Sequence, residues 1–311
     1  MQPADANEVG VLVGNNSQSG RAFMHLNGTT SFLDLSEAFA VNNQGVILGR
    51  SESSFTSYDI RTGRYTAVGP ASNVNRLSDI NDHGWMTGFG GPPNAESDFA
   101  WLTRLRAPAE GHGTLPPMGI DLLFPKLNNL GQMTGVSYQE GGIGHEAAVN
   151  MPSTPNSLAA GFTKVSLGRF HGSAHNLPTA INDQGLVVGF SFVHASSNDR
   201  LAAWYFDMSG SKGYEPIGES LYAVIPLAAS NSGEVVGAFS SGVGNNNTAH
   251  HAFTFSASKG FVDLSANGPP NVTLTRAHTV TASGIIAGIS VDRSGRSRGF
   301  VLRPRRGAVP L

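Results

Sequence analysis

The chain has 311 residues, of which only 14% are charged, and its formal net charge at pH 7 is −2. This balance is not that of a nucleic-acid-binding protein, whose affinity depends on neutralising phosphates with Lys and Arg. The sequence contains no Cys, which excludes a disulfide framework, a thiolate nucleophile and a Cys-ligated metal. No apolar run is long enough to cross a membrane as a helix.

A pattern of eight residues recurs along the chain and organises it. Each copy begins with a polar turn that ends in Gly, continues with a short apolar run, and ends in a second Gly. In the fifth copy the turn ends at Gly185, the apolar run is Leu186-Val187-Val188, and the second glycine is Gly189. Such internal repetition indicates a fold built from similar structural units. The seven copies occupy residues 7–14, 42–49, 81–88, 128–135, 182–189, 230–237 and 281–288.

Each copy has the chemistry of a tight β-hairpin. Asn and Asp bond their own backbone, and Gly adopts a positive φ without a steric penalty. We expect the apolar run to be a strand buried on both faces, and the second Gly to let a neighbouring backbone or ring approach. Further short strands follow, as at residues 201–204, 251–255 and 261–264. Each unit of about 35 to 54 residues therefore predicts four antiparallel strands, which is typical of a propeller blade.

We predict an all-β fold: one domain over residues 1–311 that forms a seven-bladed β-propeller of four-stranded antiparallel blades. The first unit shows no convincing first strand and the last no convincing fourth, so residues 307–311 are expected to pair with the first unit and close the ring. If the terminal units merge, six blades result. An open β-solenoid is the alternative, although its capping segments are not evident. The units cover approximately residues 1–36, 37–70, 71–119, 120–169, 170–219, 220–266 and 267–311.

The repeat resembles a known family. The stretches His251-Ala252-Phe253, Phe261-Val262-Asp263-Leu264 and 181–191 are similar to the bacterial HAF-type extracellular repeat. The resemblance covers nearly the whole chain, but in several units Arg or Leu stands in place of the His, and Ala147 stands in place of the Phe. It implies a secreted or surface protein. It implies no catalytic residues, because the motif is structural.

Candidate site residues are those that the repeat does not require. The uniform turns suit a structural role, whereas the variable loops at the opposite face of the ring suit function. His145 and His251 occupy a repeat position that structure explains. Five other His, together with Tyr138 and Tyr222, could supply acid–base chemistry, the plain alternative being solvated loop residues. These five are His171, His175, His194, His250 and His278.

Three arginines could bind a carboxylate near the same rim. Arg76 and Arg276 stand at one repeat position at the entry of an inner strand, and Arg169 lies between units. A guanidinium there could clamp a carboxylate bidentately, or it could pair with a nearby Asp or Glu of the chain. Glu140 and Asp199 are candidate acids in variable loops. The three Trp are expected to pack in the core rather than to stack on sugars.

Two functions follow from this set. The first is a secreted propeller that binds a glycan or another small or surface ligand at its variable-loop face, through Arg76, Arg169, Arg276, His250, Glu140 and Asp199. The alternative is an enzyme with one funnel site, a polysaccharide lyase acting on a uronate-containing glycan. There His171, His175, His194, His278, Tyr138 or Tyr222 would move the proton while Arg neutralises the carboxylate.

The remaining expectations concern partners and location. We expect no nucleic-acid partner, no membrane span and a monomer. The composition favours a secreted, extracellular or periplasmic protein, although residues 1–7 lack the features of a signal peptide. The sequence identifies no cofactor, and it contains no metal-ligand spacing.

Overall fold

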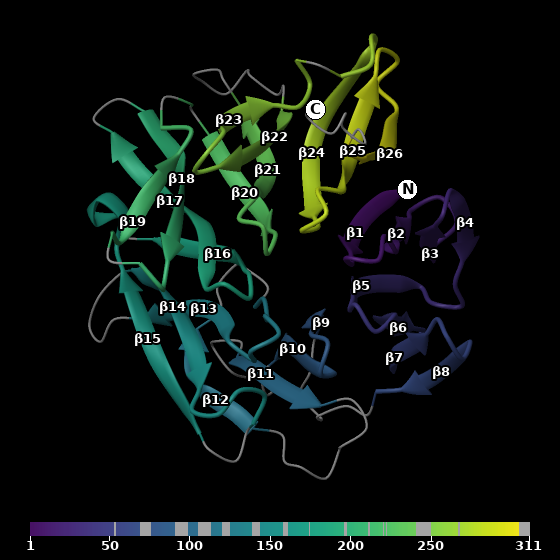
Figure 1. Cartoon of the computed structure of the whole chain (residues 1–311), viewed down its shortest axis with the longest axis horizontal. Coiled ribbons are helices and arrows are strands. Elements are labelled where there is room, and N and C mark those ends of the chain that lie inside the picture. The colour runs from purple at the N-terminus through teal and green to yellow at the C-terminus, as the bar shows by residue number, and fades with distance from the viewer. Residues whose placement is uncertain are drawn as a thin grey trace, which may run out of the picture.

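The computed structural model shows sheets standing side by side around a common axis, with the N-terminus beside the last sheet (Figure 1). Within the described residues no α-helix occurs, and no helix has the length and apolarity to cross a membrane. The structure describes residues 1–52, 54–68, 76–90, 99–104, 113–119, 125–138, 144–157, 161–173, 175–195, 198–210, 212–219, 221, 223–240, 250–266 and 268–304.

The first three sheets each contain four antiparallel strands in chain order. The first comprises β1 (Gln2–Ala6), β2 (Leu12–Asn16), β3 (Arg21–Leu26) and β4 (Thr29–Phe32). The second comprises β5 (Glu37–Val41), β6 (Val46–Ser51), β7 (Ser54–Asp59) and β8 (Arg64–Ala67). The third comprises β9 (Arg76–Ile80), β10 (Trp85–Gly90), β11 (Phe99–Arg104) and β12 (Gly113–Gly119).

The remaining strands form three sheets of unequal size. A three-stranded sheet holds β13 (Met133–Tyr138), β14 (His145–Pro152) and β15 (Phe162–Gly168). After a short 3₁₀ helix, η1 (Phe170–Gly172), an eight-stranded sheet holds β16 (Asn176–Ile181), β17 (Leu186–Ala195), β18 (Asn198–Asp207), β19 (Tyr214–Ile217), β20 (Ala223–Ala229), β21 (Val235–Ser240), β22 (His251–Ser256) and β23 (Gly260–Asp263). The last sheet holds β24 (Val272–Val280), β25 (Ile286–Asp292) and β26 (Ser297–Leu302).

The all-β prediction is confirmed, but the prediction of uniform four-stranded blades is wrong, because two sheets have three strands and one has eight. Within the part of the chain that the structure describes, the sheet of β13–β15 has no first strand, since residues 125–132 pair with it through a bridge between Leu127 and Met133. There the N–H of Lys126 donates to the Thr134 side chain at 3.0 Å instead of to a strand carbonyl. The eight-stranded sheet is joined between β18 and β20 by one parallel pair, Leu201 and Ala223.

The first unit does have a first strand, contrary to expectation. β1 (Gln2–Ala6) has neither apolar alternation nor β-branched residues, so its sequence carries no strand signal. It pairs with β2, and tertiary context overrides its weak local preference. Residues 307–311, which were expected to close the ring, lie outside the described residues. The ring closes instead by contacts between the first and last units, which exclude an open solenoid: the N–H of Ala282 donates to the Glu8 carboxylate at 2.7 Å.

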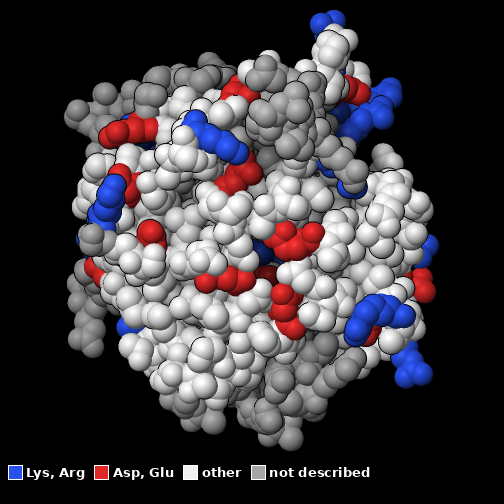
Figure 2. Space-filling model, viewed as in Figure 1, with Lys and Arg blue, Asp and Glu red and all other residues white. Residues whose placement is uncertain are grey.

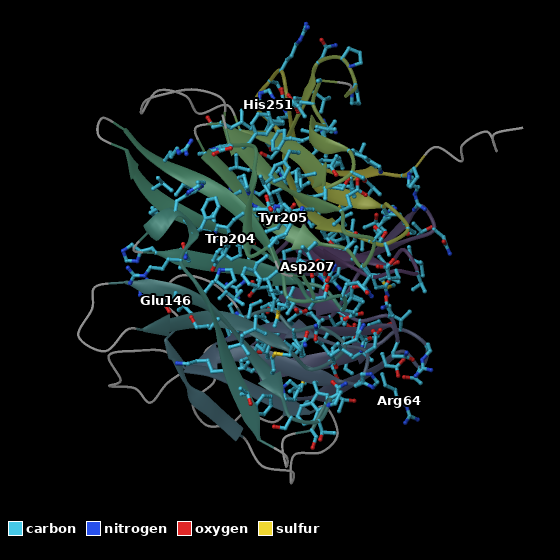
Figure 3. The ribbon with its side chains drawn as sticks, turned by 60° about the vertical axis from the view of Figure 1, so that its left-hand side comes forward. Arg64, Glu146, Trp204, Tyr205, Asp207 and His251 are labelled. Carbon is cyan, nitrogen blue, oxygen red and sulfur yellow. The ribbon has the colours of Figure 1, made fainter. Side chains whose placement is uncertain are left out.

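The hydrophobic core lies between neighbouring sheets rather than in one central cluster. Leu48 of the second unit packs with Leu77 and Met86 of the third, and all three are almost fully buried. Similar clusters join the first unit to the second, the fourth to the fifth, the fifth to the sixth and the sixth to the seventh, and Phe23 packs with Ala287 between the first and last units. Figure 3 shows side chains filling the spaces between the sheets, with Trp204 among them. Trp204 has no solvent exposure, as expected for a packing role.

The second glycine of the repeat is fixed by a close approach. A Cβ added at Gly189 would clash with the carbonyl oxygen of Leu177 and with the ring of Trp204. The same carbonyl clash recurs at Gly237 and Gly288. Opposite these glycines the inner strands contain β-bulges, which shift the register and re-aim the last residues of each strand. The predicted close approach is thus confirmed, and it sets which inner-strand residues face the centre.

Candidate functional site

The first residue of each turn links its own hairpin to the next unit. Asn182 Oδ1 accepts the N–H of Leu186 at 2.9 Å, and Asn182 Nδ2 donates to the Ser230 carbonyl oxygen at 2.7 Å. Ser230 has no side-chain amide that could donate to the next unit. Its Oγ accepts within its own turn, from the N–H of Glu234 at 3.2 Å. The link to the next unit is made by Asn7, Asn42, Asn81, Asn128 and Asn182.

The second residue of each turn adds a parallel link, and we call the two sets of bonds the belt. The N–H of Asn43 donates to Asp82 Oδ1 at 2.7 Å, and equivalent bonds join the units as far as Asn231. The belt closes where the N–H of Ala282 donates to Glu8. At the junction from Asn231 to Ala282 this second link is missing, because Ala282 has no side-chain acceptor. The belt fixes the turns around the axis of the ring.

Inside the belt lies a depression with a volume of about 190 Å³. The turn residues form its rim, and the last residues of the inner strands form its wall. Its lining contains five carboxylates and one ammonium group. Figure 2 shows acidic side chains gathered around the centre of this face, with a basic side chain between them at depth. The charged lining residues are Asp5, Glu8, Asp79, Asp82, Asp183 and Lys126.

The deeper charges occupy one position of the repeat, two residues before the turn. In the first, third and fourth units this position holds Asp5, Asp79 and Lys126. In the second, fifth and sixth units it holds Ala, and in the seventh Thr279. Because the fold accepts Ala at this position, the three charges are not required to build the blades. Their side chains give one arc of the wall a polarity that the rest lacks.

Both Asp carboxylates are anchored by backbone N–H groups of two units. Asp5 accepts from Ala6 at 2.8 Å and from Val41 in the next unit at 2.9 Å. Asp79 accepts from Ile80 and from Leu127 of the next unit, each at 3.0 Å. These bonds fix the carboxylates while leaving each oxygen with further acceptor capacity.

Burial and neighbouring charges shift the pKa values of two groups in this arc. Burial raises the pKa of Asp5 to about 6. Burial lowers the pKa of Lys126, but the carboxylates of Asp79 and Asp5 outweigh it, so its net pKa is raised. Lys126 is therefore cationic at neutral pH, and it offsets one of the two carboxylates. The arc keeps a net negative charge when both Asp are ionised.

His278 lies on the same wall, one residue further from its turn. Burial, and then the nearby Arg276 guanidinium, lower the pKa of His278 to about 4. The imidazole is therefore neutral at pH 7, and its Nε2 is buried without a hydrogen-bond partner among the described residues. Of the sequence-predicted candidates whose side chains the structure describes, His278 alone lines this depression.

Two of the three predicted arginines form ion pairs within the chain. Arg76 forms an ion pair with Glu37 at 2.8 Å and lies over the ring of Phe39, which matches the alternative of an internal pair. Arg276 is exposed on β24. Arg169 pairs with Glu146 at 3.4 Å. Arg76 thus lies at the boundary between the second and third units, whereas Arg169 lies at the boundary between the fourth and fifth units.

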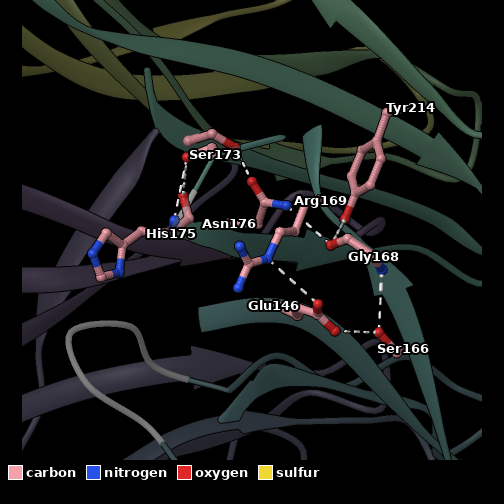
Figure 4. Close-up of polar contacts among 9 residues, drawn as sticks. Glu146, Ser166, Gly168, Arg169, Ser173, His175, Asn176 and Tyr214 are labelled. Carbon is pink, nitrogen blue, oxygen red and sulfur yellow. Dashed lines mark hydrogen bonds and ion pairs between the residues drawn. The ribbon is translucent and has the colours of Figure 1, made fainter. Parts of the chain in front are cut away.

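A polar network surrounds Arg169 between the fourth and fifth units (Figure 4). Glu146 accepts from Ser166 Oγ at 2.9 Å as well as pairing with Arg169. The carbonyl oxygen of Gly168 accepts from Asn176 Nδ2 and from the Tyr214 hydroxyl, each at 3.0 Å. This network ties β14, β15, β16 and β19 together.

The predicted histidines of this region take different positions. His175 lies beside His145, and their Nδ1 atoms are 2.9 Å apart. His171 is exposed in η1 with a φ of 49°, and its ring lies against Phe170. His250 is exposed. Glu140 and Tyr222 lie outside the described residues, and so do the side chains of Tyr138, His194 and Asp199.

Asp5, Asp79 and Lys126 were not among the candidate residues predicted from the sequence. A signal was present, since aligning the seven copies places all three at one position otherwise filled by Ala or Thr. The sequence does not show that this position faces the centre of the ring. The bulge in the inner strand decides it, and no residue type marks that bulge.

Comparisons with known proteins establish the fold and no more. No family model and no curated protein sequence matches the chain. Acylaminoacyl peptidase from Pyrococcus horikoshii matches with a TM-score of 0.61 at 10% identity, over 96% of this chain and 50% of that one. The chain thus spans about half the length of that peptidase.

Two further structures are covered almost completely. The β-propeller domain of the Trilobed protease from Pyrococcus furiosus has a TM-score of 0.61 at 9% identity, over 97% of this chain and 95% of that one. Hsv2 from Kluyveromyces lactis has a TM-score of 0.51 at 10% identity, over 97% and 98%. Together with the ring of sheets, these likenesses show that the chain folds as a β-propeller.

Proposed function

We propose that the chain is a binding propeller whose ligand presents a cationic group to the depression inside the belt. The observation that carries the proposal is the arc of Asp5, Asp79 and Lys126, three charges that the fold does not require. Five carboxylates against one ammonium group make the lining net negative, and a low-dielectric funnel strengthens the attraction for a cation. Backbone N–H groups hold both Asp carboxylates in place before a ligand arrives.

The size of the depression narrows the ligand. Its volume of about 190 Å³ is below the roughly 300 to 1,000 Å³ that hold a drug-sized molecule. It therefore suits one small group: a primary amine, either free or on a single sugar unit such as a hexosamine. This keeps the expected glycan or small-molecule ligand but moves it from the variable loops to the turn face. The described arginines near the loop face favour this move, since Arg76 and Arg169 pair with Glu37 and Glu146.

The lyase alternative requires an arginine facing a substrate carboxylate beside a His or Tyr. Arg276 lies near His278, but the lining of the depression carries five carboxylates and would repel a uronate, so we favour a cationic ligand. We further propose that the ring has seven blades, with the eight-stranded sheet divided at the pair of Leu201 and Ala223. The HAF-type resemblance, the secreted location and the monomeric state stay predictions.

A matched pair of ligands tests the binding proposal. Glucosamine and N-acetylglucosamine differ in one acetyl group, which removes the charge of the amine nitrogen, so calorimetric titration of each at about pH 6.5, where the glucosamine amine is protonated, tests the ammonium group. We expect heat of binding for glucosamine only, with an affinity that falls as salt is raised. Putrescine and 1,4-butanediol provide the same contrast without a sugar. Equal responses within each pair, or no response to any of the four, would contradict the proposal.

Variants locate the site. Asp79→Asn keeps one acceptor for the backbone but removes the charge, and it should weaken amine binding about tenfold or more. Asp34→Asn is the control, since Asp34 is exposed on the outside of the first unit in an ion pair with Arg21. Binding that is equally strong in wild type and Asp79→Asn would place the ligand elsewhere.

A further inference from the structure

Two imidazoles meet at the boundary between the fourth and fifth units, outside the depression. His145 begins β14 and His175 precedes β16, and these two residues form an isolated parallel bridge. Their Nδ1 atoms are 2.9 Å apart, their ring centroids are 4.9 Å apart and the rings are tilted by 49°. Both residues are half-buried, so the pair is reachable from solvent.

The backbone holds His175 in place independently of its imidazole. Ser173 Oγ accepts the His175 N–H at 3.2 Å and itself donates to the carbonyl oxygen of Phe192 at 2.6 Å. The N–H of Phe192 in turn donates to the His175 carbonyl oxygen at 3.3 Å. The Phe192 ring stands edge-on to the imidazole, with centroids 6.0 Å apart. The backbone position of His175 is therefore held by bonds that do not involve its imidazole, and the Phe192 ring flanks that imidazole.

The spacing of the two nitrogens selects a geometry. Imidazole nitrogen lies about 2.0 to 2.1 Å from a bound first-row metal. Two such bonds to atoms 2.9 Å apart enclose an angle of about 90° at the metal. A tetrahedral ion would need the nitrogens about 3.3 Å apart. A right angle is that of neighbouring ligands in a square-planar or tetragonal complex, which with nitrogen and oxygen ligands favours Cu(II) or Ni(II).

We propose that His145 and His175 form a site for a tetragonal divalent metal, Cu(II) or Ni(II), bound through both Nδ1 atoms. In the metal-free pair one Nδ1 carries the proton that the other accepts. On binding, that imidazole moves its proton to Nε2, so both Nδ1 lone pairs become available and no net proton is released from the neutral pair. Within the described residues no group of three His, Asp or Glu side chains could hold a metal. Water or an incoming oxygen ligand would complete the coordination.

The repeat supplies a matched control for this site. His251 stands at the same repeat position in the sixth unit as His145 does in the fourth. Its Nδ1 contacts Asp263 at 3.1 Å rather than a second imidazole. A carboxylate partner fixes one imidazole but does not offer a second nitrogen at right angles. The two positions thus differ in the partner that faces Nδ1, an imidazole at His145 and a carboxylate at His251.

The experiment titrates tag-free protein with Cu(II) and with Ni(II), and follows the heat of binding and the Cu(II) electron paramagnetic resonance spectrum. The variants are His145→Ala, His175→Ala and His251→Ala. We expect one tight equivalent in wild type, with an axial spectrum that shows two equatorial nitrogens. Loss of either ligand should weaken binding more than about tenfold, since even changes around metal ligands cost that much. His251→Ala should bind like wild type.

Three outcomes would overturn the proposal: no binding to wild type, binding to the His145→Ala or His175→Ala variant that is as strong as to wild type, or weakening in the His251→Ala variant that equals the weakening in these two. Circular dichroism and the melting temperature establish that each variant is folded. If a variant does not fold, the wild-type spectrum with ¹⁵N-labelled histidine still decides, because fewer than two coordinated histidine nitrogens contradicts the site.

Discussion

The turns of the belt and the wall of the depression belong to the same seven hairpins but follow opposite rules. In the turns, Asn recurs at the first position because its amide bonds both its own hairpin and the next unit. Two residues earlier the side chain faces the open centre, and Ala, Thr, Asp and Lys all occur. A position with a structural task repeats, whereas a position without one is free to take up chemistry.

The difference shows where to look for function in a repeat protein. Residues that depart from the repeat are the best functional candidates where the fold needs no particular side chain at that position. Asp5, Asp79 and Lys126 depart at such a position. Variation in the loops carries less information, because loops vary for many reasons.

The largest effect is expected at a glycine of the repeat. Gly189→Ala places a Cβ against the Leu177 carbonyl and the Trp204 ring, and it should lower the free energy of unfolding by about 3 kcal/mol or more. Gly233→Ala is the control, because its φ is +80° but nothing lies within 4 Å of the added Cβ; it should cost about 1 to 2 kcal/mol. Urea denaturation measures both. Equal losses would mean that the close approach is not what fixes Gly189.

A smaller effect is expected in the belt. Asn182→Ala removes the acceptor for Leu186 and the donor to Ser230, and should cost about 2 kcal/mol. Ser230→Ala removes only bonds within its own turn and should cost about 1 kcal/mol. The same denaturation assay compares them. A Ser230 variant as unstable as the Asn182 variant would show that the link between units adds nothing.

Protonation of His278, in the wall of the depression, should make the free energy of unfolding depend on pH. The folded protein holds His278 with a pKa of about 4, whereas the unfolded chain protonates it near 6.5. The unfolded state therefore binds more protons in this window, and the contribution of His278 is lost as the pH falls from 6.5 towards 4. Asp5, with its pKa raised to about 6, acts in the opposite sense, so the test is a difference between two proteins.

We expect His278→Gln to match wild type at pH 7.5 and to exceed its unfolding free energy by about 1 to 2 kcal/mol at pH 4.5. Urea denaturation at the two pH values measures this. Parallel losses in wild type and variant on acidification would show that His278 is as easily protonated in the fold as in the unfolded chain.

The smallest expected effect is an increase in the free energy of unfolding. Ala282→Asn supplies a side-chain acceptor at the junction where the belt lacks its second link, in a turn whose counterparts hold Asn43, Asn129 and Asn231. The N–H of Asn231 should then donate to it, and the free energy of unfolding should rise by about 0.5 to 1 kcal/mol. Ala257→Asn, outside the belt, is the control. A neutral result would show that the junction is already satisfied.

The sequence predicts the fold well because the turn chemistry repeats. Asn and Gly mark each hairpin, and the second Gly correctly indicates a close approach at Gly189 and Gly237. It fails at β1 (Gln2–Ala6), which forms through its neighbours. It also fails before β13, where the side chain of Thr134 takes the place of a ladder bond.

The candidate site was less predictable, because it depends on how the units are placed around the axis. His278 was named from the sequence, but the charged arc beside it was not. Whether Arg76 is free for a ligand depends on Glu37 of the preceding unit, a contact that repeat alignment does not show. The approach of His145 to His175 likewise arises at a boundary between units.

The contact of Glu8 with Ala282 has a consequence for the order of assembly. It joins residues 274 apart in the chain, whereas neighbouring turns such as Asn182 and Ser230 are 48 apart. Because the entropy of closing a loop grows only with the logarithm of its length, this last contact costs about 1.5 kcal/mol more than a neighbouring one. Successive units can therefore stack from local contacts before the circle shuts. Under mechanical load, the same junction is where the circle should part first.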